Sequence, residues 1–119
     1  MSKSAKSVLY FSYYLFFVGL QLVFIPNFFL KTAQLPETSE VWIRVVGILA
    51  LILGFYYHQS AKKELIEFCK LTVVGRSLYF LGSAGLVIAQ LAPPIFLVFG
   101  LVDALSAFWT WQSLKSEGK

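Results

Sequence analysis

The chain has 119 residues, of which 58% are hydrophobic and 13% charged, and its mean hydropathy is +0.73. A water-soluble domain carries about 25% charged residues, so the composition excludes an ordinary soluble globule and indicates a small membrane protein of a single domain, residues 1–119. The formal net charge is +4, and the single cysteine, Cys69, excludes a disulfide framework and a zinc site built from cysteines.

The first uncharged stretch predicts a membrane-spanning helix over residues 8–26. It lies between Lys6 and Lys31, which enclose 24 residues without a charge. A bilayer core of ~30 Å needs roughly 20 apolar residues of helix, and Pro26-Asn27 supplies a turn at the end of this one. The basic tail before it is similar to a secretory signal, but no small-residue cleavage site follows, so we expect an uncleaved span.

The rest of the chain predicts further spanning helices. Arg44 and Lys62 enclose 17 uncharged residues, and the last uncharged stretch is divided by Pro93-Pro94, which predicts a tight hairpin. The runs are continuously apolar and do not alternate, so a β-barrel is excluded, and the predicted fold class is an all-α integral membrane four-helix bundle. The three further spans are predicted over residues 42–60, 73–91 and 95–113.

The distribution of positive charges predicts the orientation. Lysines concentrate in the tail 1–7, in the 61–72 loop and at the C-terminal end, whereas the opposite side holds Lys31. Because cytoplasmic segments carry the excess of basic residues, both termini are expected to face the cytoplasm. The positive net charge is thus explained by the orientation of the protein in the membrane. We expect membrane lipid as a partner and no nucleic acid.

Each predicted helix carries polar residues seven positions apart, which share one face because seven residues make nearly two helical turns. A charged group at a helix centre costs about 2.5–3.5 kcal/mol on insertion scales, so such residues are expected to face protein or water. Four converging stripes would form a polar seam; the alternative is that side chains at helix ends extend to the membrane surface. The polar members of the stripes are Ser7, Tyr14, Gln21, Arg44, His58, Arg76, Ser83, Gln90, Asp103 and Thr110.

Asp103 is the most informative residue of this seam, because it lies about nine residues, or ~13 Å, from either end of the predicted fourth helix. Its carboxyl group must be protonated, hydrated or paired, and Arg44 and Arg76 approach its depth from opposite ends. Two arginines against one aspartate leave a surplus positive charge, which indicates an anionic ligand or lipid head group. The alternative is a structural ion pair that fixes the order of the helices.

The residues with metal-binding or catalytic chemistry are scattered. His58 has no second histidine, glutamate or cysteine at ligand spacing on its helix, so we expect no metal site. No glycine-rich phosphate loop and no pair of carboxylates within the membrane is present. We therefore expect no cofactor and assign no catalytic residue.

The sequence of the second predicted span aligns with that of the fourth when the residue numbers are offset by 53. Apolar helices match easily by chance, yet the alignment suggests that two helices are repeated by the next two. The aligned pairs are Val45 and Val98, Gly47 and Gly100, Phe55 and Phe108, Gln59-Ser60 and Gln112-Ser113.

Short motifs stand out in the apolar sequence: Trp42-x-Arg44-x-x-Gly47, Gly75-Arg76, and Gly100-x-x-Asp103 followed by Trp109-Thr110. This set resembles small bacterial four-helix membrane proteins of the DoxX-like kind, most of them uncharacterised. The resemblance covers roughly residues 10–115 and implies a four-helix bundle in a prokaryotic inner membrane. Some members of that group are subunits associated with quinone-linked oxidation or redox-stress complexes.

Three functions are compatible with these observations, each as a homo-oligomer or as a subunit of a membrane complex. We favour a non-enzymatic accessory or scaffold subunit whose polar seam holds the helices and binds a lipid or a quinone-like or anionic amphiphile. The second is a small proton-coupled transporter using Asp103. Small multidrug antiporters have this size, but their essential glutamate lies in the first helix, where this chain has Gln21. The third is an enzyme using His58, Tyr56 and Tyr57 on a lipid or quinone, for which the sequence offers no acid–base partner.

Overall fold

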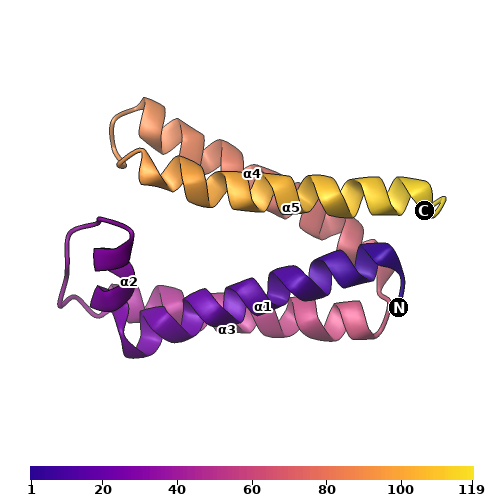
Figure 1. Ribbon diagram of the computed structural model, residues 1–119, viewed down its shortest axis with the longest axis horizontal. Helices are drawn as coiled ribbons and strands as arrows, with labels where there is room; N and C mark the ends of the chain where they lie inside the picture. The colour runs from indigo at the N-terminus through magenta and orange to yellow at the C-terminus, as the bar shows by residue number, and fades with distance from the viewer. The chain divides into compact units, whose positions relative to one another are not determined.

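The computed structural model describes residues 1–119 and contains helices and no strand. Four of its helices are long and apolar enough to cross a bilayer: α1, α3, α4 and α5. The protein is therefore an integral membrane protein, and the predicted all-α fold class with four spanning helices is confirmed. The helices are α1 (Lys3–Phe24), α2 (Pro26–Thr32), α3 (Trp42–Lys62), α4 (Ile66–Ile88) and α5 (Ile95–Ser116) (Figure 1).

The helix boundaries differ from the predicted spans most clearly at α4, which begins at Ile66 and not at residue 73. The predicted 61–72 loop is a short turn around Glu64, whose φ is +54°. The charged residues of this segment mark the end of the apolar stretch but not the end of the helix, because lysine and glutamate are good helix formers. Hydropathy therefore located the lipid-facing part of α4 and missed its first turns.

Gln90 lies outside α4, which ends at Ile88, so the prediction that it continues the helical stripe of Arg76 and Ser83 is wrong. Its φ is +61°, and its backbone N–H donates to the Val87 carbonyl at 3.0 Å. The next N–H, of Leu91, donates back to the Leu86 carbonyl at 2.9 Å. These two bonds close the helix in a Schellman motif, ahead of two prolines that could not continue it.

The chain divides into two compact units, which are described separately. Leu9–Gln59 form one, called here the α1–α3 unit. Met1–Val8 together with Ser60–Lys119 form the other, called the α4–α5 unit. The expectation of a single domain concerns how these units assemble and stays a prediction.

In the α1–α3 unit the two long helices run antiparallel, side by side (Figure 1). A Cβ atom on Gly47 would lie 2.8 Å from Leu22 Cβ and 2.9 Å from the Gly19 carbonyl oxygen. A Cβ atom on Gly54 would lie 2.8 Å from the Phe16 ring. Glycine at these positions lets the two backbones approach closely, as at other helix contacts within membranes.

The connection between α1 and α3 contains α2, a helix that the sequence did not predict. Pro26 is its first residue, a position where the fixed φ of proline suits a helix. The missing N–H costs nothing there, because the first N–H of a helix has no acceptor within the helix. Leu30 packs with Leu22 and Ile43 in a small buried core at this end of the unit. Pro26-Asn27 therefore ends α1 as predicted, but begins another helix and not a loop.

In the α4–α5 unit the two helices form a second antiparallel hairpin (Figure 1). A Cβ atom on Gly100 would lie 3.1 Å from the Phe80 ring, so this glycine faces the preceding long helix as Gly47 does. With the predicted shift of 53 positions, all buried residues of α3 except Ile43 fall on buried residues of α5, which supports the repeat. These pairs are Gly47 and Gly100, Gly54 and Ala107, Tyr57 and Thr110, Ser60 and Ser113, Ala61 and Leu114.

Candidate functional site

Arg76 lies near the middle of α4, and its side chain is 1% exposed. Its Nε donates a hydrogen bond to the Thr72 carbonyl at 3.2 Å, and its Nη2 donates to Thr72 Oγ1 at 3.0 Å. From α5, Thr110 Oγ1 accepts from Nη2 at 2.9 Å and Ser106 Oγ accepts from Nη1 at 3.1 Å. A guanidinium buried at this depth needs such acceptors, since a charge without them is strongly unfavourable away from water.

Two of the accepting hydroxyls pass their own protons to backbone carbonyls. Thr72 Oγ1 donates to the Cys69 carbonyl at 2.7 Å, and Ser106 Oγ donates to the Asp103 carbonyl at 2.9 Å. Each hydroxyl thus accepts from the Arg76 guanidinium while donating to a carbonyl three residues back. Linked bonds of this kind polarise one another, and bonds from a charged donor are the stronger ones.

The third hydroxyl connects the hairpin to the beginning of α1. Thr110 Oγ1 lies 2.6 Å from Ser7 Oγ, and Ser7 Oγ donates to the Ser4 carbonyl at 2.6 Å. Thr110 Oγ1 also lies 3.2 Å from the Ser106 carbonyl, to which it donates, and it is the acceptor from Arg76. We call Arg76, Thr72, Ser106, Thr110 and Ser7 the Arg76 network; it joins three segments of the α4–α5 unit.

Asp103 lies beside this network, but its carboxylate makes neither a hydrogen bond nor a salt bridge. The charge of Arg76 acts on it through space, and the side chain is half-buried. Of the two arginines considered from the sequence, Arg76 is therefore the electrostatic partner, without a direct ion pair.

Tyr79 and Ser83 continue the polar edge of α4 beyond Arg76. The side chains of Tyr79 and Ser83 are close enough to interact, and Tyr79 lies within the electrostatic influence of Asp103. Ser83 is 6% exposed and packs against Gly100 of α5, 3.4 Å from the position of an added Cβ. Ser83 was predicted as a seam residue and Tyr79 was not. Spacings of three and four residues from Arg76 and Ser83 are the signal that finds it.

Thr72 and Ser106 are also members of the network that heptad spacing missed. Thr72 lies four residues before Arg76, and Ser106 lies four residues before Thr110. Positions four apart are neighbours on a helix, so both hydroxyls flank a predicted seam residue. A search at a spacing of seven residues finds positions two turns apart and misses those one turn away.

Two other predicted seam residues, Arg44 and His58, lie at opposite ends of α3 in the α1–α3 unit. The exposed Arg44 donates from Nη1 to the Val23 carbonyl near the end of α1, where a cation complements the helix dipole. The His58 ring lies 5.9 Å from the Tyr13 ring and 6.0 Å from the Phe16 ring. They share a face as predicted, but fourteen residues separate them by about 21 Å of helix, so they do not act together.

Gln21 and Tyr14 are the predicted seam residues of α1. Gln21 Nε2 donates to the carbonyl of Phe17, one turn earlier, at 3.5 Å. The Tyr14 ring packs 5.4 Å from the Phe11 ring. Both of these contacts lie within α1 itself.

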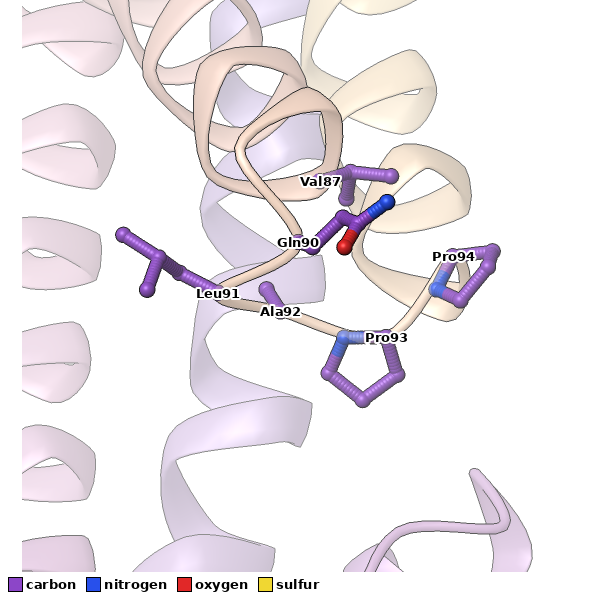
Figure 2. A pocket seen from close by; sticks show the side chains of 6 residues that line it. All are labelled: Val87, Gln90, Leu91, Ala92, Pro93 and Pro94. Carbon is purple, nitrogen blue, oxygen red and sulfur yellow. The ribbon is translucent and has the colours of Figure 1, made fainter.

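Gln90 lines a hollow of about 440 Å³ at the turn between α4 and α5. Figure 2 shows its amide directed toward the side of Pro94, with Leu91 directed away. At 1.5 Å per residue, the end of α4 is about 18 Å along the helix from Arg76. Gln90 is therefore separate from the Arg76 network.

Two glutamates bind the N-terminus of α1 at the far end of the α4–α5 unit. Glu117 accepts from the backbone N–H of Lys3 at 3.0 Å and of Ser4 at 3.2 Å. Glu64 accepts from the Ser2 backbone N–H at 2.6 Å and from its hydroxyl at 2.8 Å, while Ser2 Oγ accepts from the Ala5 N–H. These contacts satisfy the free N–H groups of the first helical turn, and the carboxylates complement the helix dipole.

This glutamate clasp predicts acid sensitivity. The Ser2 backbone and hydroxyl lower the pKa of Glu64, and the Ser4 side chain together with the Ser4 and Lys3 backbone lowers the pKa of Glu117, both below the ordinary 4.5. Because the folded pKa is depressed, the stabilisation is present above pH 4.5 and is lost as pH falls through the lower folded value. We expect the melting temperature in detergent to fall in that range.

The control for the clasp is Glu64→Gln/Glu117→Gln. It should lower the melting temperature at neutral pH and flatten its decrease in acid, because the groups that titrate are gone. Glu67→Gln is the matched surface variant, since Glu67 pairs with Lys70 at 3.4 Å on an exposed turn of α4. An acid decrease that is the same in the double variant and in the wild type would contradict the clasp.

Comparison with family models, with curated proteins and with solved structures finds no match to this chain. The functional argument therefore depends on the residues themselves. The two features that distinguish the site are the enclosed Arg76 network and the half-buried carboxylate of Asp103 beside it.

Proposed function

We propose that this integral membrane protein is an accessory or scaffold subunit, without catalytic turnover of its own. The observation that carries the proposal is the Arg76 network. Its polar groups are used on one another, with the guanidinium 1% exposed and its acceptors drawn from α4 and α5. A polar group used in this way stabilises helix contacts within a bilayer.

The same proposal includes a lipid or quinone-like amphiphile as ligand. Asp103 supplies an unpaired acceptor and Tyr79, 46% exposed, supplies a hydroxyl. These groups suit an uncharged head group with hydroxyl and carbonyl oxygens better than an anion, which Asp103 would repel. Arg76 contributes a positive electrostatic field at Asp103.

Native mass spectrometry with lipid identification tests this site. Wild-type protein in mild detergent is expected to retain an amphiphile that Asp103→Asn loses, because the amide presents a donor and no charge. Ser77→Ala is the matched control, since the Ser77 hydroxyl donates to the Val73 carbonyl of its own helix at 2.8 Å and is exposed. A protein free of ligand in both forms would make the polar groups structural only.

The second candidate function is a small proton-coupled transporter. The observation in its favour is that the carboxyl group of Asp103 lies at membrane depth and takes part in no salt bridge. Such a group is free to bind and release a proton. Proteoliposomes distinguish the two candidates: proton-coupled flux that Asp103→Asn abolishes would favour the transporter. Flux at the background level in both forms would favour the accessory subunit.

We further propose a bacterial inner membrane, with both termini in the cytoplasm, and membership of the DoxX-like group. The concentration of lysines in the 1–7 tail and around the α3–α4 turn supports the orientation. The motifs around Arg44, Arg76 and Asp103 support the group. In that group, association with a larger membrane complex or with a second copy is the expected setting.

A further inference from the structure

The short helix α2 has one face that belongs to the core of the α1–α3 unit. Leu30 is 7% exposed and packs with Leu22 of α1 and Ile43 of α3. Phe29 packs against the same cluster from α2 itself. These contacts hold α2 against the end of the hairpin formed by α1 and α3 (Figure 1).

The opposite face of α2 is apolar and uncovered. Phe28 is 62% exposed, although its neighbour Phe29 is packed. Phe24, the last residue of α1, and Ile25, which follows it, are 69% and 50% exposed. This surface continues the lipid-facing side of α1, where Phe17 is 66% exposed.

Polar and amphipathic groups border this apolar face. Lys31 in the last turn of α2 is exposed, and Asn27 Oδ1 accepts from the Thr38 backbone N–H at 2.9 Å, which secures the following loop. Trp42 begins α3 and donates its indole N–H to Glu40. Tryptophan and lysine at the ends of spanning helices are typical of the boundary between lipid head groups and acyl chains.

We propose that α2 is an interfacial helix, with Phe24, Ile25 and Phe28 among the upper acyl chains and Lys31 at the lipid phosphates. The occupant of the apolar face is therefore lipid. The argument is continuity: α2 begins two residues after a membrane-spanning helix ends, and its uncovered face extends the surface of that helix which contacts lipid. The inference depends on membrane insertion and not on the proposed function.

Quenching of tryptophan fluorescence by brominated lipids tests the proposal. Single-tryptophan forms of the full chain carry Phe28→Trp, Phe29→Trp or Phe17→Trp, with Trp42, Trp109 and Trp111 changed to phenylalanine. They are placed in vesicles of phosphatidylcholine and phosphatidylglycerol, brominated either near the glycerol or near the chain ends. Phe17→Trp reports insertion of α1, and Phe29→Trp reports the packed side of α2.

At position 28, bromines near the glycerol are expected to quench more strongly than deep ones, roughly twofold or more, because interfacial helices lie about 5–10 Å into the boundary. Position 29 should be quenched less than position 28. Absent quenching at 28 with quenching retained at 17 would place water or a protein partner on this face and overturn the proposal. Stronger quenching at 28 by the deep bromines would also overturn it.

A spin label provides a second measurement that does not require replacing the tryptophans. Cys69 is buried and is changed to serine, and a cysteine replaces Phe28. The label at position 28 should be more accessible to oxygen, which partitions into acyl chains, than to a water-soluble nickel complex. The reverse order would overturn the proposal.

Discussion

Gly47→Ala is expected to destabilise the α1–α3 unit by about 1–3 kcal/mol, the usual cost of overpacking a tight contact. The added methyl group would lie 2.8 Å from Leu22 Cβ and 2.9 Å from the Gly19 carbonyl oxygen. The second of these is a backbone atom, which cannot rotate away, so the two helices must separate. Thermal unfolding in mild detergent measures the loss.

Gly82→Ala is the matched control for this prediction. It is another glycine within a spanning helix, and a Cβ atom there has no neighbour within 4 Å. Because alanine favours a helix over glycine by about 0.8–1 kcal/mol, this variant should be neutral or slightly more stable. Equal melting temperatures for the two variants would show that α1 and α3 are not in close contact at Gly47.

Thr110→Val is expected to destabilise the α4–α5 unit by about 1–3 kcal/mol, the cost of leaving a buried polar group without its partner. Valine keeps the shape of threonine but removes the acceptor for Arg76 Nη2 and the hydrogen bond to Ser7 Oγ. Average interhelical hydrogen bonds in membranes contribute about 0.6 kcal/mol, but this one bears a buried positive charge and is expected to exceed that value. Unfolding in detergent measures the difference from wild type.

A double-mutant cycle separates the hydrogen bond from a general effect of valine. Arg76→Met removes the buried charge, so Thr110→Val should cost much less in that background. Ser77→Ala, whose hydroxyl donates within its own helix, is the control and should change stability little. Additive effects of Arg76→Met and Thr110→Val would contradict the network.

Several features of the fold follow from local sequence. The apolar stretches, the last of them divided at Pro93-Pro94, predict four spanning helices, because a bilayer core needs roughly 20 apolar residues of helix and a helix satisfies its own backbone there. The prolines at 26 and 93–94 end helices where expected, and the shift that pairs Gly47 with Gly100 predicts which face of α5 is buried. Boundaries at charged segments were less accurate, since α4 begins at Ile66 within the predicted loop.

The heptad pattern located part of the candidate site. Ser7, Arg76 and Thr110 are all members of the predicted stripes and are joined in one network. Arg44 and His58 share the same pattern but lie at separate ends of α3, so spacing along a helix did not distinguish network residues from helix-end residues. Gln90 shares it as well and lies beyond the helix, in a turn.

The sequence by itself determined that this protein lies in a lipid bilayer, how many helices span it, and that Arg76 is a charged residue at membrane depth, since these depend on runs of neighbouring residues. Only the tertiary structure decided the partners of that charge. Arg76 bonds to residues 30 and 34 positions away, and Thr110 to one 103 positions away. The approach of α5 to α4, and of the first turn of α1 to α5, brings these hydroxyls to the guanidinium, and no local pattern encodes such an approach.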